Sequence, residues 1–351
     1  GGRRHLPPRG VPGAPGSLQA TARSRTGSRS RGGTRSRGTF LPAPGCPGPP
    51  GGKCVKDRAA SPSPRLGSHG NLSLRGPQEA LDRTVHCQPA VFVASLAAVE
   101  KLHHLQPAVI ENCVAAAGFS VGEFAALVFA GAMEFSEGLH AVKIRAEAMQ
   151  EASEAVPSGM LSVLGQPQSK FASACLEARE HCRTLGVEDP VCEVASYLFP
   201  DCRVISGHLQ VGVEGDSYHF RRTKMLPVSG GFHTRLMEPA LGPLARALES
   251  VSVKKPLVSV HSNVDGNRYG HPKNIPKLLV RQVVSPVKWE QTMHAVFRRR
   301  KGTEFPRTFE VGPGRQLGSI LKSCNLQAWK SYGHVDVLEG GRAGVPEDDR
   351  A

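Results

Sequence analysis

The stretch Val114-Ala115-Ala116-Ala117-Gly118-Phe119-Ser120-Val121-Gly122-Glu123 decides the fold of this chain. Its apolar first half predicts a short buried strand, and the Phe124-Ala125-Ala126-Leu127 run that follows predicts a helix. Between them lies a Gly-x-Ser-x-Gly pattern, which is typical of a serine nucleophile on a sharp strand-to-helix turn. A turn serine that caps a helix fits the same pattern, so the motif alone leaves both interpretations open.

Ser120 would have suitable surroundings for nucleophilic chemistry at such a turn. The flanking glycines are needed because the turn is too tight for a Cβ on either side. The serine would lie at a helix N-terminus, whose free backbone N–H groups favour negative charge. This position suits attack on a carbonyl whose oxygen becomes an anion.

The basic charge of the chain is concentrated at its amino end. Of the formal net charge of +14 over 351 residues, +11 comes from residues 1–56, which hold nine Arg, two Lys and no acid. The same segment has 13 Gly, 9 Pro and few core-forming residues, so residues 1–70 are predicted to be disordered. Three interpretations stay open for it: a mitochondrial transit segment, an RNA-associating tail, or sequence foreign to the domain.

The cysteines and the apolar stretches exclude several classes of site. Nine cysteines form no Cys-x-x-Cys pair, so the sequence indicates neither a zinc site nor a redox dithiol, and free thiols fit a reducing compartment. The longest apolar stretch, residues 113–133, is interrupted by serine, glycine and glutamate. It therefore predicts a buried strand and helix and not a membrane span.

From Asn71 onward, strands and helices alternate, which predicts a mostly parallel sheet covered by helices. The predicted strands are 114–118, 160–164, 191–195, 203–206, 224–228, 257–260 and 308–311. The predicted helices are 91–102, 136–155 with Ser136 as its cap, 169–182, 233–248 with Pro239 near its first turn, and 315–322. The strand-rich part between 158 and 228 predicts a separate small subdomain.

His233 is the best candidate for the base that a serine nucleophile needs. It follows a predicted strand and opens a predicted helix, so its ring could project at the sheet edge that also carries Ser120. A surface or cap histidine is the alternative. No convincing acidic partner follows Ser120 in the sequence.

Several segments occur together, in one order and at one spacing over residues 71–335. They are Gln88-Pro89-Ala90, 118–123, Ile144-Arg145 with 148–150, 204–207, 227–234, Arg281-Gln282 with 285–289, and 310–314. In this combination the chain resembles the malonyl-CoA:acyl carrier protein transacylase family, and its mitochondrial members in particular.

The resemblance implies a fold and its domains. The fold would be α/β, with an α/β-hydrolase-like parallel-sheet large subdomain and an inserted small ferredoxin-like subdomain. The large subdomain would comprise residues 71–157 and 229–335, and the small one residues 158–228. Residues 1–70 and 336–351 would be a disordered basic segment and a disordered tail.

The resemblance also implies catalytic roles. Ser120 would take the malonyl group, and His233 would act as its general base and later as the acid for the leaving thiol. The backbone carbonyl of Gln282, in place of an acid, would accept the imidazole N–H. These roles describe ping-pong acyl transfer through a malonyl-serine ester.

Three further residues would bind the substrate. Arg145 would anchor the malonyl carboxylate, because a guanidinium binds a carboxylate bidentately and stays charged. Without the resemblance, the alternation with Lys143 and Glu147 favours a solvated residue of an amphipathic helix at Arg145. Val121 would supply one oxyanion N–H, and Gln88 would complete the substrate site.

The partners implied are a coenzyme A thioester and acyl carrier protein with its phosphopantetheine arm. No cofactor and no metal are implied, and nucleic acid is not expected. Carrier proteins are acidic, so the basic runs 221–224 and 298–301 are candidate docking sites, although either could be a solvated face. The resemblance places the protein in the mitochondrial matrix, within fatty acid synthesis.

The chain also departs from the family. The family opens with a strand ending in Gly-Gln-Gly-Ser-Gln, whose first Gln is an oxyanion donor, and nothing in residues 1–70 matches it. Losing one such donor costs about 10²–10³ in turnover. Losing the strand and its helix would cost more, since it would uncover apolar core and an unpaired strand edge. We therefore expect a chain that is poorly stable and weakly active or inactive. Smaller departures are Phe119 where His is common, Ala195-Ser196 where Asn is usual, and a short 208–217 segment.

Four interpretations of function follow from the sequence. The first is malonyl transfer to carrier protein. A generic serine esterase would need an acid after Ser120 and would not need Arg145. An RNA-associating protein would depend on the basic amino end. A non-catalytic relative with a broken sheet is the fourth.

Overall fold

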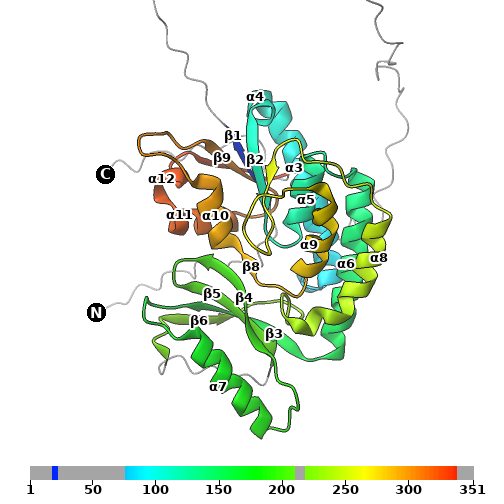
Figure 1. Ribbon diagram of the computed structural model, residues 1–351, viewed down its shortest axis with the longest axis vertical. Coiled ribbons are helices and arrows are strands. Elements are labelled where there is room, and N and C mark those ends of the chain that lie inside the picture. Colours follow the sequence, from blue (N-terminus) through cyan, green and yellow to red (C-terminus); the bar gives the residue numbers. More distant parts are fainter. Residues whose placement is uncertain (1–17, 23–75, 210–217, 338–351) are drawn as a thin grey trace, which may run out of the picture.

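The computed structural model describes residues 18–22, 76–209 and 218–337. They form an α/β protein with two five-stranded sheets, named here after the parts that hold them: the larger sheet belongs to the large helix-rich part at the top of Figure 1, and the smaller sheet to the small part below it. The expected disorder of residues 1–17, 23–70 and 338–351 lies outside the described residues.

The larger sheet has the strand order β10-β9-β1-β2-β7. Its strands are β1 (Leu18–Ala22), β2 (Cys113–Gly118), β7 (Ser259–Val260), β9 (Arg307–Val311) and β10 (Tyr332–Val335). β9 pairs with β10 in parallel, and β2 pairs with β7 in parallel. β1 is antiparallel to both β2 and β9, so the other four strands all run in one direction, as the alternating sequence predicts.

Strand β1 corrects the prediction that all of residues 1–70 lack regular structure. Leu18 pairs with Gly118 on one side and with Val311 on the other, and Ala22 pairs with Cys113 and Arg307. The prediction was wrong here because it considered only apolar side chains. A strand between two others is also stabilised by its backbone N–H and C=O groups, and without β1 the edges of β2 and β9 would be unpaired.

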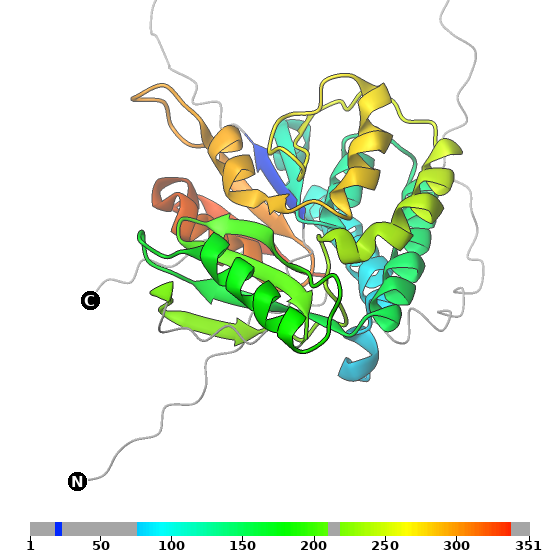
Figure 2. The same cartoon turned by 60° about the horizontal axis from the view of Figure 1, so that its bottom comes forward.

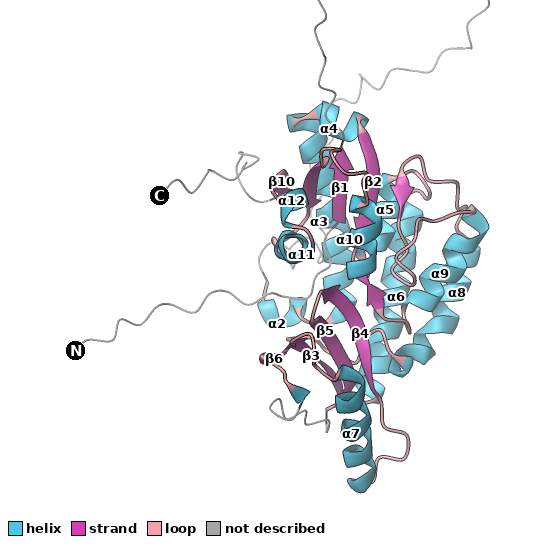
Figure 3. Cartoon of the chain, turned by 60° about the vertical axis from the view of Figure 1, so that its left-hand side comes forward, coloured by secondary structure: helices cyan, strands magenta, loops and turns pink. Residues whose placement is uncertain are grey.

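Helices cover both faces of the larger sheet (Figures 1 and 3). Ala116 belongs to the apolar cluster that includes α3 (Thr84–Leu105), α5 (Gly122–Phe129) and α6 (Phe135–Ala155). The next residue, Ala117, belongs to a second cluster on the opposite face. The other helices of this part are α2 (Gln78–Leu81), α4 (Pro107–Glu111), α8 (Leu241–Glu249), α9 (Ile275–Gln282), α10 (Trp289–Phe297), α11 (Gln316–Cys324), α12 (Leu326–Trp329) and the short 3-10 turns η2 (Arg235–Ala240) and η3 (Pro272–Asn274).

The smaller sheet has the order β6-β3-β5-β4-β8. Its strands are β3 (Ser158–Leu164), β4 (Cys192–Phe199), β5 (Cys202–His208), β6 (Arg222–Met225) and β8 (Val287–Lys288). All neighbours among β6, β3, β5 and β4 are antiparallel, and α7 (Phe171–Thr184) lies across this sheet in Figure 2. β8 is parallel to β4 and ties the later part of the chain to this sheet. Residues 210–217, within the segment expected to be short, lie outside the described residues.

The predicted cap of one helix and the predicted start of another are wrong. α6 begins at Phe135, and Glu134 is its N-cap instead of Ser136, because Glu134 and Glu137 exchange side-chain and backbone hydrogen bonds in a capping box. The helix predicted for 233–248 starts as the 3-10 turn η2 at Arg235, with Thr234 as its cap, and becomes α-helical at Leu241. His233 therefore lies before the helix, in the loop that carries it to the larger sheet.

Candidate active site

Ser120 lies on the turn between β2 and α5, just after the C-terminal end of β2 in the larger sheet. Its backbone has φ +51°, a left-handed conformation that is uncommon for a residue other than glycine and that often marks functional positions. A Cβ on Gly118 would lie 1.8 Å from the carbonyl oxygen of Gly122, so only glycine fits there. The turn is as tight as the sequence predicts, and it leaves the Ser120 side chain partly exposed.

His233 and Ser120 are brought into hydrogen-bond contact. The distance from Ser120 Oγ to His233 Nε2 is 2.8 Å, and His233 Nδ1 is 3.0 Å from the backbone carbonyl oxygen of Gln282. A carbonyl only accepts, so the proton is on Nδ1 and Nε2 is free to accept the serine proton. His233 also has a left-handed backbone, with φ +62°.

The environment of His233 favours the neutral imidazole. Burial first and the nearby Arg145 cation second lower its pKa from 6.5 to about 4, against the opposing effect of hydrogen bonds to Gln282 and Ser285. At neutral pH the ring is therefore uncharged and can act as a base. No carboxylate contacts the ring among the described residues.

Arg145 projects from α6 into the same site and is 1% exposed. Its Nη2 donates to Ser120 Oγ at 3.0 Å and to Gln282 Oε1 at 2.8 Å, and its Nη1 donates to Gln88 Oε1. Each of these partners is neutral. The guanidinium thus lies buried next to the nucleophile without a carboxylate in contact, which favours binding of an anionic ligand.

Arg145 remains a cation in this environment. Burial lowers its pKa from 12.5 to about 10, and the carboxylate of Glu123 partly opposes this effect. Its Nε is buried and has no hydrogen-bond partner among the described residues. An N–H that can still donate is consistent with a site for a carboxylate oxygen.

Gln88 and Val121 occupy positions close to the same centre. Gln88 is buried on α3 and contacts Arg145, while its Nε2 donates to Thr84 Oγ1 at 2.9 Å. Val121 is the N-cap residue of α5, where a backbone N–H has no acceptor within the helix. All six residues singled out in the sequence thus lie around one turn.

The structure adds three buried residues that the sequence did not single out: Glu123, Asn263 and Tyr269. Burial raises the pKa of Glu123 from 4.5 to about 7, although hydrogen bonds from Tyr269, Gln282 and Asn263 lower it. The available signal was a glutamate at the start of an otherwise apolar helix. Asn263 and Tyr269 follow strand β7, and no motif marked them.

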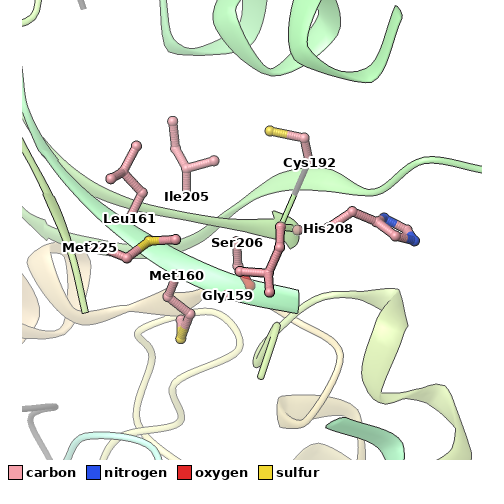
Figure 4. A pocket seen from close by; sticks show the side chains of 10 residues that line it. Gly159, Met160, Leu161, Cys192, Ile205, Ser206, His208 and Met225 are labelled. Atoms are coloured by element: carbon pink, nitrogen blue, oxygen red, sulfur yellow. The ribbon is translucent and has the colours of Figure 1, made fainter. Parts of the chain in front are cut away.

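Other features lie away from this turn. A small pocket is lined by residues of β3 and β5 together with Cys192 of β4, Met225 of β6 and Leu209, and none of the predicted site residues lines it (Figure 4). The basic run Arg221–Lys224 overlaps β6 at the edge of the smaller sheet, where Arg222 is exposed.

Neither a metal site nor a membrane-spanning helix is found among the described residues. No group of three or more His, Cys, Asp or Glu residues there could hold a metal ion. In the same part of the chain, every helix is too short or too polar to cross a membrane.

Comparison with known proteins identifies relatives over most of the described chain. The family model described as acyl transferase domain matches residues 70–306, which is more than half of the chain. The human protein named mitochondrial malonyl-CoA-acyl carrier protein transacylase is 78% identical over 272 residues, covering 76% of this chain and 70% of that protein. A probable enzyme of the same name in Drosophila melanogaster is 45% identical over 75% of this chain and 71% of its own.

Solved structures give the same result at lower identity. The malonyl CoA-acyl carrier protein transacylase of Coxiella burnetii superimposes with a TM-score of 0.67 and 30% identity, covering 76% of this chain and 80% of that chain. The acyl-carrier-protein S-malonyltransferase of Burkholderia pseudomallei gives a TM-score of 0.66 and 30% identity over 76% of this chain and 83% of that chain.

Proposed function

The chain belongs to the acyl transferase domain family, and from this premise we propose that it transfers a malonyl group from malonyl-CoA to acyl carrier protein. The observation that carries the proposal is the convergence of a nucleophile, a neutral base and a buried cation. Ser120, His233 and Arg145 come from three separate elements and meet at Ser120 Oγ. A thioester that also carries a carboxylate would match all three groups.

The first half-reaction would acylate Ser120. His233 Nε2 takes the Oγ proton while Oγ attacks the thioester carbonyl, and the Val121 N–H donates to the oxygen that becomes negative. The carbon–sulfur bond then breaks, and the imidazolium returns its proton to the departing coenzyme A thiolate. The products are free coenzyme A and a malonyl ester on Ser120.

The second half-reaction would use the same groups in reverse. The phosphopantetheine thiol of the carrier protein gives its proton to His233 Nε2 and attacks the ester carbonyl. When the carbon–oxygen bond breaks, Ser120 Oγ recovers the proton, and the malonyl group leaves on the carrier. The Gln282 carbonyl holds the ring in the required tautomer in both directions.

Arg145 would select the acyl group. A malonyl carboxylate can accept from Nη2 and other guanidinium N–H groups, whereas an acetyl group offers no charge to this buried cation. The energetic difference is large because the guanidinium has no other carboxylate in contact among the described residues.

We propose that the two sheets belong to two subdomains with different roles. We assign residues 71–157 and 229–335 to a large catalytic subdomain and residues 158–228 to a small ferredoxin-like subdomain, in line with the antiparallel order β6-β3-β5-β4. The exposed basic residues of β6 would contact the acidic carrier protein. Since the human and mouse relatives are named mitochondrial, we place the protein in the mitochondrial matrix, within fatty acid synthesis.

Intact-mass measurement after mixing with malonyl-CoA tests the proposal. The chain should gain one malonyl group, Ser120→Ala should gain none, and addition of phosphopantetheinylated carrier protein should remove the group from the wild type. A generic esterase would release the acyl group to water without a carrier. A chain that forms no adduct would instead be a non-catalytic relative.

A further inference from the structure

Glu123 is a fully buried carboxylate three residues after the nucleophile, and its partners are all neutral donors. Its Oε2 accepts from the backbone N–H of Asn263 at 3.2 Å and from Gln282 Nε2, and its Oε1 accepts from the Tyr269 hydroxyl. A buried carboxylate is strongly destabilising unless donors surround it. The fold thus supplies three donors, two from the loop after β7 and one from helix α9, to keep this group beside the active site.

One branch of this network reaches the nucleophile turn through Asn263. The Asn263 side chain accepts from the Ser120 N–H at 2.6 Å and donates to the Gly118 carbonyl at 2.8 Å. The amide therefore spans the turn and stabilises its left-handed residue. Since the Asn263 backbone is itself held by Glu123, the carboxylate fixes the position of this bridge.

The second branch reaches Arg145 and His233 through Gln282. Gln282 Nε2 donates to Glu123 and, at 3.1 Å, to the Ser120 carbonyl, whereas Gln282 Oε1 accepts from Arg145. A carboxylate only accepts and a guanidinium only donates, so Glu123 dictates which end of the amide faces Arg145. The backbone carbonyl of the same Gln282 holds His233.

We propose that Glu123 is a positioning residue for the transfer reaction, fixing Ser120 through Asn263, and Arg145 and His233 through Gln282. This inference rests on the proposed function. It assigns a role to an acid that does not contact the histidine and therefore does not complete a Ser-His-acid triad. Its hydrogen-bonded connections to the reacting groups run through Asn263 and Gln282, and its charge also acts on Arg145.

The charge of Glu123 changes within the working pH range. Its pKa is raised to about 7 by burial, and the titratable or charged groups that act on it are Tyr269 and Arg145. The ionised carboxylate is the stronger acceptor for Gln282 and Asn263. The site should therefore be better ordered above this pKa than below it.

Two substitutions separate the charge from the packing. Glu123→Gln keeps the shape and one acceptor oxygen but removes the ionisation. Tyr269→Phe removes a hydrogen bond that lowers the pKa of Glu123 and should move the ionisation to higher pH.

Matched controls are available at a second buried glutamate. Glu310 is fully buried, accepts from the N–H groups of Leu317 and Gly318 at 3.0 and 2.7 Å, and accepts from the Tyr332 hydroxyl at 2.6 Å. Glu310→Gln and Tyr332→Phe repeat the same changes away from Ser120. A purely structural effect of losing a buried carboxylate would appear in both pairs.

The measurement is kcat/KM for acylation of Ser120 by malonyl-CoA as a function of pH, since kcat/KM reports ionisations of the free enzyme. The wild type should rise through about pH 7, and Tyr269→Phe should rise at higher pH. Glu123→Gln should show no rise and should be roughly 10- to 100-fold slower above the transition, because small misplacements of reacting groups have effects of this size. The Glu310 and Tyr332 variants should follow the wild type.

A Glu123→Gln profile identical to that of the wild type, or one shared with Glu310→Gln, would overturn the inference. The side-chain N–H NMR signals of Arg145 and His233 provide a readout that does not need turnover. They should shift across neutral pH in the wild type but not in Glu123→Gln. If the wild type forms no acyl-enzyme, the proposed function fails, and these signals still decide whether Glu123 positions the two groups.

Discussion

Arg145 donates a hydrogen bond from Nη2 to Ser120 Oγ, at 3.0 Å, while the same oxygen contacts His233 at 2.8 Å. The cation thus occupies a lone pair of the nucleophile when no carboxylate is bound. A malonyl carboxylate competing for the guanidinium would release that lone pair and would also reduce the positive field that lowers the pKa of His233. Under the proposed function, substrate binding and activation of the serine would therefore be connected through one side chain.

Replacing Arg145 by Ala should abolish the preference for malonyl over acetyl groups. Malonyl transfer should fall about 10- to 100-fold, the usual effect of losing hydrogen bonds to a charged group, while acetyl transfer should not fall. The rates with malonyl-CoA and acetyl-CoA measure this. Lys143→Ala, on the exposed side of the same helix, is the control and should leave both rates unchanged.

Replacing Gly118 by Ala should destroy the nucleophile turn. The new Cβ would lie 1.8 Å from the Gly122 carbonyl oxygen, a clash with backbone that a rotamer change cannot relieve. We expect a loss of unfolding free energy of about 1–3 kcal/mol or more, with no detectable acylation of Ser120. Denaturant unfolding and intact mass test this prediction, and Gly270→Ala, where nothing lies within 4 Å, should be silent.

Proline at position 20 should weaken the larger sheet. Ala20 lies in the middle of β1, opposite Ala116 and Phe309, and proline removes its N–H from the ladder. The unfolding free energy should fall by about 3 kcal/mol, estimated from the cost of proline inside regular structure, whereas Ala20→Val should have little effect. Equal melting curves for wild type and Ala20→Pro would contradict the placement of β1.

The free energy of unfolding should depend on pH through His233 and Glu123, whose contributions change in opposite directions as the pH rises. The pKa of His233 is lowered to about 4, so its contribution is present above pH 6.5 and is lost as the pH falls towards 4. The pKa of Glu123 is raised to about 7, so its contribution is present below pH 4.5 and is lost as the pH rises to 7. The melting temperature of Glu123→Gln should therefore rise relative to the wild type between pH 4.5 and 7.

Turnover of this chain should be low compared with that of its relatives. The 351 residues contain no Gly-Gln-Gly-Ser-Gln segment, and a site with one oxyanion donor fewer would lose about 10²–10³ in turnover. Side-by-side rates with the human relative would measure the deficit. A cooperative thermal transition together with an equal rate would contradict both the expected weak stability and the expected low turnover.

The sequence predicted the central elements because their patterns are local. The strand before Ser120, the apolar helix after it and the α6 helix follow from apolar periodicity, and the structure confirms each within a few residues. Arg145 could have been assigned to the buried face of α6 from its spacing to Val142 and Met149, which are also buried. The charged neighbours Lys143 and Glu147 instead favoured a solvent-exposed position for Arg145.

Other features depend on contacts that no local pattern contains. β8 has two residues and was not predicted, and it becomes a strand only because β4 is there to pair with it. Asn263 and Tyr269 reach Ser120 and Glu123 across more than 140 positions of sequence. The sequence also did not single out Glu123, because the only role expected for an acid was to contact the imidazole of His233. Glu123 instead contacts the amide groups of Asn263 and Gln282.

The reversed direction of β1 makes this strand separable from the rest of the fold. It enters the sheet beside Gly118 and leaves beside Cys113, and residues 23–75 join it to the part that begins at Gly76. Its described bonds are backbone ladders, which a free peptide can form equally well. If the chain were cut within that connection, the larger part should bind a peptide with the sequence of β1 between β2 and β9. Adding or removing this peptide would then close or open the sheet.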